Sequence, residues 1–285
     1  MEKESTLTRR VRVIRPDDRL DAGVFSAARH LLREILLHRD HIKVAFRQDF
    51  RNLYQGTFFG VIWNIVLPLV PVLIYALLSL YRVLPGFEGV NPGTYVALGA
   101  TVWFLLAGCV QQPLQTVRAR NAEVMKTALP LSAMVVSSFA QLLFDTLMRV
   151  ALIAVMILIT ATEVHSTALL IPLALLPAIM LFFGLGLILG VANVIYADVG
   201  RVTGIAIQYG IFISGVIFPI ALLPFNEILM WNPAYVLIEE VRILCFRGLP
   251  ETGWLLGAYA VVGILVFFWG CRIFYLMEYR VRGVG

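Results

Sequence analysis

Six long apolar stretches follow one another after residue 56. Each reaches or approaches the roughly 20 residues that an α-helix needs to cross about 30 Å of hydrocarbon. Apolar residues run continuously within them and do not alternate with polar ones, which argues against the strands of a membrane β-barrel. A helix also satisfies its own backbone hydrogen bonds in lipid. The pattern therefore predicts an all-α integral membrane protein with six transmembrane helices, at residues 58–81, 94–114, 132–161, 168–196, 202–223 and 254–276.

A different pattern occupies the polar segment before these stretches. Between residues 22 and 56, apolar residues fall near one face of a helix and Arg or Lys residues lie largely between them, which is typical of a basic amphipathic helix. We expect this helix to lie in the lipid headgroup layer; the alternative is a solvated helix that packs on a soluble partner. The charged residues expected along this interface helix are Arg39, Lys43, Arg47, Asp49 and Arg51.

The distribution of basic residues predicts the domains and the orientation. Residues 1–56 form a cytoplasmic N-terminal segment, and residues 57–285 form a six-helix transmembrane domain. The N-terminal segment lacks an apolar stretch long enough for a signal sequence, so we expect no cleaved targeting peptide. It contains more than half of the 23 Lys and Arg residues, and most of the others flank spans on the same side. The opposite side holds only Arg82, Arg242 and Arg247, so the positive-inside rule places both termini in the cytoplasm.

The segment between the fifth and sixth predicted spans, residues 224–253, is long and apolar for a loop. Asn232 and Pro233 mark a break between two short elements. We expect two short helices that enter the outer leaflet and return; a surface amphipathic loop is the alternative. Irregular backbone at that depth needs protein or a wet cavity beside it. A re-entrant segment would therefore line the outer end of a pathway.

Composition narrows the class of protein. Hydrophobic residues make up 60% of the chain and charged residues 14%, about half the usual charged share of a soluble domain. One soluble core could not hide so much apolar surface. This excludes a soluble enzyme, a disordered chain and a nucleic-acid-binding domain. The formal net charge of +5 then reflects basic cytoplasmic loops, with no nucleic-acid partner.

Motifs for covalent chemistry are absent from the sequence. None of the three lysines, Lys3, Lys43 and Lys126, belongs to a nucleotide-binding loop, and there is no zinc-binding or nucleophile-elbow motif. We expect no catalytic residue, no metal and no cofactor in this chain. Asp145 and Arg149 are the ionisable pair inside a predicted span, one turn apart. They are more simply a neutralised structural pair than the isolated carboxylate of an ion-coupled carrier.

Aromatic and small residues are numerous at the predicted spans. An interfacial belt explains most of the aromatic residues, and the sharper hypothesis is that some face an internal channel and contact the apolar faces of sugar rings. The candidate channel aromatics are Tyr54, Phe58, Trp63, Trp103, Phe104 and Phe218. Gly-x3-Gly pairs that begin at Gly56, Gly186 and Gly200 indicate close helix packing, within the chain or between subunits.

Residues 47–69 resemble the start of the first span in ABC-2 type polysaccharide exporter permeases, the membrane subunits for O-antigen, capsule and teichoic acid. The usual pattern there is Arg-Asp, a basic stretch ending in Tyr, then Gly-x-x-Trp and a Pro. Gln48 stands where Arg is common, and Leu53 precedes the Tyr. The residues that match in order are Asp49, Arg51, Tyr54, Gly60, Trp63 and Pro68.

Three later segments resemble the same family, so that the resemblance covers residues 40–280. Residues 121–132 resemble its cytoplasmic loop with the coupling helix, and residues 196–201 resemble its turn after the fourth span. Phe218-Pro219, followed by Asn232-Pro233, resembles the end of the fifth span and the outer re-entrant segment. The residues that this resemblance assigns to coupling with an ATPase are Asn121, Ala122, Glu123, Val124, Met125 and Lys126.

The resemblance implies a half-transporter of the bacterial inner membrane with the ABC-2, or type V exporter, fold. Two copies would form a continuous channel, and a separate cytoplasmic ATPase in two copies would bind ATP and Mg²⁺. The interface helix would contact the same ATPase. The cargo would be an O-antigen-like glycan, of the kind used in lipopolysaccharide biosynthesis, on an undecaprenyl-pyrophosphate-type membrane lipid.

Other functions remain open at this point. Arg47, Arg51, Arg118 and Arg120 could attract the phosphates of the lipid, or they could reflect only the positive-inside bias. An ABC-2 permease for a drug, a lipid or a lipo-oligosaccharide is the first alternative. A membrane enzyme would need a polar dyad or metal site at membrane depth, and an ion-coupled carrier would transport without an ATPase.

Overall fold

The computed structural model describes most of the chain as helices. The residues that it describes are 23–54, 62, 63, 66, 70, 90–119, 130–217, 226–249 and 253–281. They contain helices and no β-strand. The predicted span at 58–81 lies outside them apart from four residues, and the predicted span at 202–223 is described only as far as residue 217.

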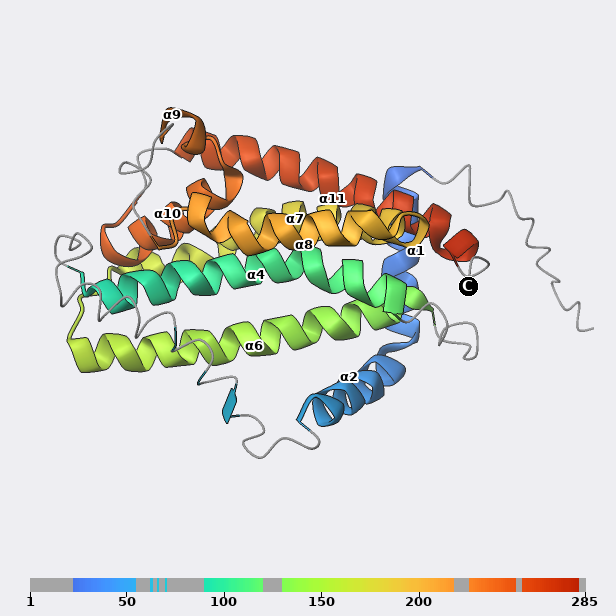
Figure 1. Cartoon of the computed structure of the whole chain (residues 1–285), viewed down its shortest axis with the longest axis horizontal. Helices are drawn as coiled ribbons and strands as arrows, with labels where there is room; N and C mark the ends of the chain where they lie inside the picture. Colours follow the sequence, from blue (N-terminus) through green and yellow to red (C-terminus); the bar gives the residue numbers. More distant parts are fainter. Residues whose placement is uncertain are drawn as a thin grey trace, which may run out of the picture.

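Four long helices lie side by side and form the body of the molecule (Figure 1). Each has the length and apolar character to cross a membrane, over Pro92–Ala119, Leu131–Thr160, Ser166–Ile195 and Gly253–Glu278. They coincide with the predicted spans at 94–114, 132–161, 168–196 and 254–276. The helices are α4 (Pro92–Ala119), α6 (Leu131–Thr160), α7 (Ile171–Ile195), which follows the 3₁₀ turn η2 (Ser166–Leu170), and α11 (Gly253–Val281).

Helix α4 is the centre of this bundle. In its most apolar 18-residue stretch 83% of the residues are buried, against 28% or fewer in the other three, so the described residues enclose α4 more fully than the other long helices. Helix α4 contacts α6, α7, the shorter α8 (Ala197–Gly210), which continues into the 3₁₀ turn η3 (Ile211–Ile213), and α10 (Pro233–Phe246). The main apolar core lies where these helices meet.

Glycines let the central helices approach to backbone distance. A Cβ at Gly186 of α7 would overlap the backbone of Cys109 in α4, and a Cβ at Gly270 of α11 would overlap the backbone of Gly184 in α7. Close packing at the Gly186 pair is thereby confirmed within the chain. The surroundings of Gly204 differ, because none of the residues that the structure describes lies within 4 Å of a Cβ placed there.

The predicted interface helix consists of two helices. Helix α1 (Val24–Leu37) ends at His38, whose ring Nδ1 lies 2.9 Å from the Glu34 carbonyl oxygen, and α2 (Arg39–Tyr54) follows directly. Figure 1 shows α1 lying across one end of the bundle and α2 beside α6 at the same end. Helix α1 buries Ala27 and Leu31 against α6 and α11. We call this end, where the C-terminal part of α11 also lies, the α1 end.

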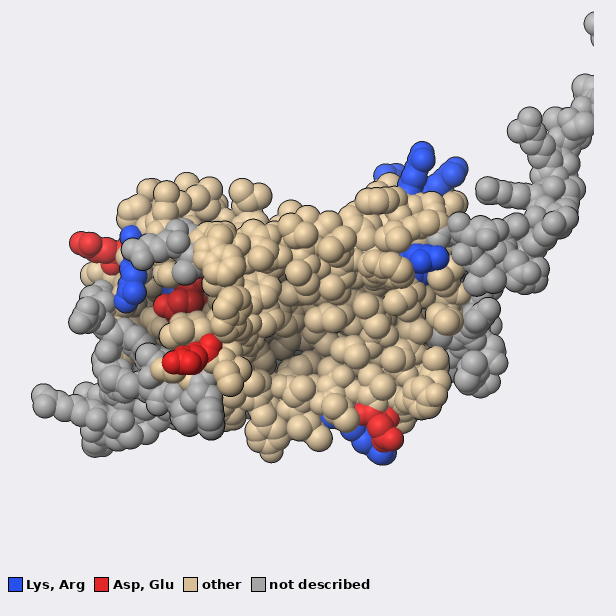
Figure 2. Space-filling view, turned by 90° about the horizontal axis from the view of Figure 1, so that it is seen from above, with Lys and Arg blue, Asp and Glu red and all other residues tan. Residues whose placement is uncertain are grey.

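The opposite end carries two short helices, α9 (Asn226–Leu229) and α10. We call it the α10 end (Figure 1). The predicted break at Asn232 is confirmed: its side-chain oxygen accepts the Ala234 N–H at 3.0 Å, and Pro233 occupies the first helical position, where no N–H is needed. Charged side chains on the face shown in Figure 2 gather toward the two ends and leave an uncharged band between them, as a membrane-spanning body requires.

Candidate functional site

Three carboxylates from three helices bind the first two turns of α6. The buried Glu278 of α11 accepts the Leu131 N–H at 3.0 Å. Glu34 of α1 accepts the Ser132 hydroxyl at 3.4 Å, and Asp49 of α2 accepts the Ser137 hydroxyl at 3.4 Å. The first N–H groups of a helix lack internal partners and its N-terminus favours negative charge. The start of α6 is therefore held by α1, α2 and α11 at the α1 end.

The start of α6 is the first part of the chain that the structure describes after the predicted coupling residues. Asn121, Ala122, Glu123, Val124, Met125 and Lys126 lie outside the described residues, between the end of α4 at Ala119 and the buried Pro130. Along the chain, that segment leads into Pro130 and the start of α6. Sequence reasoning missed the roles of Glu34 and Glu278, because each bonds to a residue about 100 positions or more away in the chain.

The predicted interface-helix residues all lie on α2. Lys43 forms an ion pair with Asp40 at 3.5 Å, and both side chains are exposed. Arg39, Arg47 and Arg51 are also exposed. Asp49 differs, since it is half-buried and bonds to α6. Four of the five residues thus present charge to the surroundings, and the fifth fixes the helix to the bundle.

A polar cavity of about 680 Å³ lies between α4, the end of α7 and α8. The amide of Asn193, which is 4% exposed, joins these three helices. Its nitrogen donates to the Leu114 carbonyl at 3.3 Å, and its oxygen accepts the Gly200 N–H at 3.0 Å and an Arg118 N–H at 3.4 Å. The residues that line the cavity with polar side chains are Gln111, Gln115, Arg118, Asn193 and Arg201.

This cavity combines donors and acceptors at the end of otherwise apolar helices. Gln111 and Gln115 lie one turn apart on α4 and supply uncharged amides. Arg201 is exposed and forms an ion pair with Asp198 at 3.0 Å. Such a surface can hold a hydroxylated or phosphorylated group near the membrane boundary. Sequence reasoning identified Arg118 but neither glutamine.

The candidate channel aromatics lie in different places. Trp103 is buried and contacts α8, since a Cβ at Gly210 would overlap its indole ring. Phe104 lies under Arg149, whose guanidinium carbon is 4.8 Å from the ring centroid. Trp63 is 42% exposed. The side chains of Tyr54, Phe58 and Phe218 lie outside the described structure.

The ionisable residues inside α6 are held by near neighbours. Asp145 accepts a hydrogen bond from the Gln141 amide at 3.1 Å, one turn earlier in the same helix. Arg149 lies against Phe104 of α4, and that cation–π contact lowers the cost of its burial. The bond from Gln141 favours a structural role for Asp145, whereas Nη1 of Arg149 is buried and has no hydrogen-bond partner among the described residues.

At the α10 end, one buried arginine joins three parts of the chain. Arg242 of α10 is 2% exposed. Its guanidinium donates to the carbonyls of Gly215 at 2.7 Å, Val216 at 3.0 Å and Tyr95 at 3.3 Å, and lies 3.6 Å from the centroid of the Tyr95 ring. A Cβ at Gly99 would overlap this guanidinium. Sequence reasoning had treated Arg242 only as one of the few basic residues on the outer side.

Groups for other chemistry are scarce in the described part. No cluster of three or more His, Cys, Asp and Glu side chains there could hold a metal ion. Burial raises the pKa of the Cys245 thiol in α10 to about 11. The thiol is therefore protonated at neutral pH and a weak nucleophile.

Comparisons with known proteins agree with this architecture. The family model described as ABC-2 type transporter matches residues 40–246. Two similar curated proteins, both O-antigen export system permease proteins RfbA from Klebsiella pneumoniae, are 21% and 22% identical to this chain over 244 residues. Each comparison covers 85% of this chain and 93% of the relative. The family match spans α2 through α10, so this chain belongs to the ABC-2 type transporter family of membrane permeases.

Proposed function

We propose that this permease is the membrane subunit of an ATP-driven exporter that moves a lipid-linked, O-antigen-like polysaccharide from the cytoplasm across the bacterial inner membrane. The family identity and the names of the two relatives support the cargo class. The observation that carries the proposal is the polar cavity between α4 and α8. Its glutamines and arginines offer partners for sugar hydroxyls and lipid phosphates.

The power source in this proposal is a separate ABC ATPase, which the family implies as the partner. Two permease subunits form the channel, and two ATPase subunits bind ATP and Mg²⁺. The ATPase contacts residues 121–126 and helix α2. Motion then passes to α6 through the Leu131–Glu278, Ser132–Glu34 and Ser137–Asp49 bonds.

The α1 end faces the cytoplasm in this proposal. Helices α1 and α2 carry basic residues there, as the positive-inside rule requires. The α10 end then faces outward, with Arg242 holding α10 against α4 at the exit of the pathway. In this proposal the segment around α9 and α10 is re-entrant, and the six spans include the predicted spans at 58–81 and 202–223, which are described only in part.

A transport assay with matched glutamine variants tests the proposal. Permease and ATPase are reconstituted in vesicles, and ATP-dependent movement of a labelled lipid-linked glycan is measured. The double variant Q111L/Q115L removes uncharged donors and acceptors from the cavity and keeps side-chain size. We expect it to reduce transport about tenfold, the effect of losing one or two hydrogen bonds.

The control is Q112L, the same change at an adjacent α4 residue that does not line the cavity. Equal transport by Q111L/Q115L and Q112L would reject the cavity as the glycan path. ATP-driven export of a drug or a simple lipid, without movement of the glycan, would show that the cargo is not a glycan. Uphill transport by the permease without any ATPase would end the proposal altogether.

A further inference from the structure

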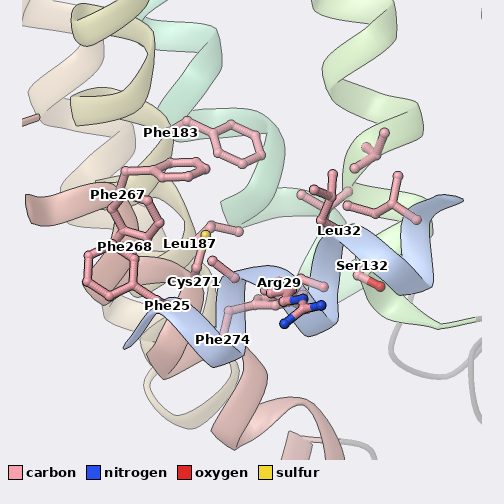
Figure 3. Close-up of a pocket in the computed structure, with 15 residues that line it drawn as sticks. Phe25, Arg29, Leu32, Ser132, Phe183, Leu187, Phe267, Phe268, Cys271 and Phe274 are labelled. Carbon is pink, nitrogen blue, oxygen red and sulfur yellow. The ribbon is translucent and has the colours of Figure 1, made fainter. Parts of the chain in front are cut away.

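A second cavity at the α1 end is apolar and separate from the polar one. It has a volume of about 420 Å³ and lies between α1, α6, α7 and α11. Figure 3 shows Phe25, Phe183, Phe267 and Phe268 gathered at one side of it, and Arg29 and Ser132 at the other. Its walls are otherwise formed by aliphatic and aromatic residues and Cys271. None of its lining residues lines the polar cavity between α4 and α8.

The cavity is built where an apolar chain can reach it. Its walls include the start of α6 and the middle and C-terminal parts of α7 and α11, three helices with the length and apolar character to cross a membrane. Phe25 and Leu32 of α1 line it and are 74% and 57% exposed, so the cavity reaches the molecular surface. Water gains no hydrogen bonds in such a space, whereas hydrocarbon fills it favourably.

Basic residues stand beside the apolar space. Arg29 lines the cavity and is exposed, and it forms no ion pair within the described part of the chain. A second hollow on α1, whose described lining includes Ser26, His30 and Arg33, shares Arg29 and Leu32 with the apolar cavity. Apolar and cationic surfaces thus adjoin on one helix. Their combination matches a molecule with a hydrocarbon chain and a negatively charged head.

From this geometry we infer that the cavity binds one membrane phospholipid with an anionic headgroup, with an acyl chain between α1 and α11 and the phosphate at Arg29. The bound lipid completes the packing of α1 against α6 and α11, beside the Glu34–Ser132 bond. Lipid composition then regulates how firmly α1 is held. This inference depends on the membrane location of the helices and not on the nature of the exported cargo.

Lipid retention by the full-length protein tests the inference. The protein is reconstituted in phosphatidylcholine bilayers with increasing phosphatidylglycerol, and native mass spectrometry counts the lipids that remain bound. We expect one phosphatidylglycerol per protomer in the wild type. R29Q should weaken its retention about fivefold, the effect of one cation near an anionic lipid, and A28W should abolish retention by filling the cavity.

Two controls match these variants. R247Q removes one exposed positive charge at the α10 end, and L158W adds the same ring at an exposed position of α6. Both should retain lipid as the wild type does. If A28W does not fold, R29Q still tests the inference, because a change at an exposed side chain leaves the fold intact. Unchanged retention in R29Q, or in a folded A28W, would overturn the inference.

Two other outcomes would assign a different occupant. Cross-linking from Cys271, which lines the cavity, to a second copy or to residues 1–22 without retained lipid would show a protein segment there. Equal retention of phosphatidylcholine and phosphatidylglycerol in every variant would remove the role of Arg29. Both results overturn the inference. They leave the proposed export function untouched, because glycan transport is measured independently.

Discussion

Replacing Glu278 by Ala removes the acceptor of the Leu131 N–H at the start of α6. Glu278 is 1% exposed, and the bond measures 3.0 Å, so water does not take its place. A hydrogen bond to a charged group contributes about 1.5–3 kcal/mol, and an anion at a partly buried helix N-terminus adds up to about 2 kcal/mol. We therefore expect Glu278→Ala to lower the free energy of unfolding by about 2–4 kcal/mol.

Glu278→Gln separates the charge from the hydrogen bond. The amide oxygen can still accept the Leu131 N–H, and a neutral bond is about half as strong as a charge-assisted one. The expected order of stability is wild type, then Gln, then Ala. Thermal unfolding of the detergent-solubilised protein measures it, with Glu227→Ala, an exposed change at the α10 end, as control.

The same variants test the path from ATPase to membrane. If Glu278 transmits the motion of the coupling segment to α6, Glu278→Gln should lower the amount of glycan transported per ATP hydrolysed. This loss should be present at temperatures at which the variant is still folded. If Glu278→Ala has the same unfolding temperature and the same amount of glycan transported per ATP as the control Glu227→Ala, the reasoning is refuted.

Three other changes test the fold and the coupling. Arg242→Met leaves three carbonyls near α10 without their donor and should cost about 3–5 kcal/mol in thermal unfolding, whereas Arg242→Lys should restore only part of that stability. Gly186→Ala should destabilise by about 1–3 kcal/mol because α4 must move away, while Gly204→Ala should change little; equal unfolding temperatures would contradict the packing described. Replacing residues 121–127 by a flexible linker should abolish ATPase coupling and leave membrane insertion intact, and export that survives the replacement would reject the coupling assignment.

The apolar helices could be predicted from sequence because each carries its signal locally. A continuous apolar run of about 20 residues identifies a span without reference to the rest of the chain. The Asn232-Pro233 break was predictable for the same reason, since capping and proline geometry are properties of neighbouring residues. The division of the interface helix at His38 was missed, because the amphipathic pattern continues on both sides of it.

The contacts that build the candidate site depend on residues far apart in the chain. Glu278 and Leu131 are 147 positions apart, and Arg242 and Tyr95 are also 147 positions apart. The periodicity of apolar residues places each residue on one face of its helix, but it does not identify the helix that packs against that face. Arg242 shows the difference: its charge contributes to the predicted orientation, and its burial appeared only with the fold.

The glycine contacts divide the molecule into a rigid block and parts that can shift. Helices α4, α7 and α11 approach to backbone distance at Gly184, Gly186 and Gly270, and any larger side chain at these positions would overlap the facing main chain. Helix α8 has no such close contact at Gly204, where none of the described residues lies within 4 Å of an added Cβ. We therefore expect α4, α7 and α11 to keep their mutual arrangement and to move as one unit when the permease changes conformation.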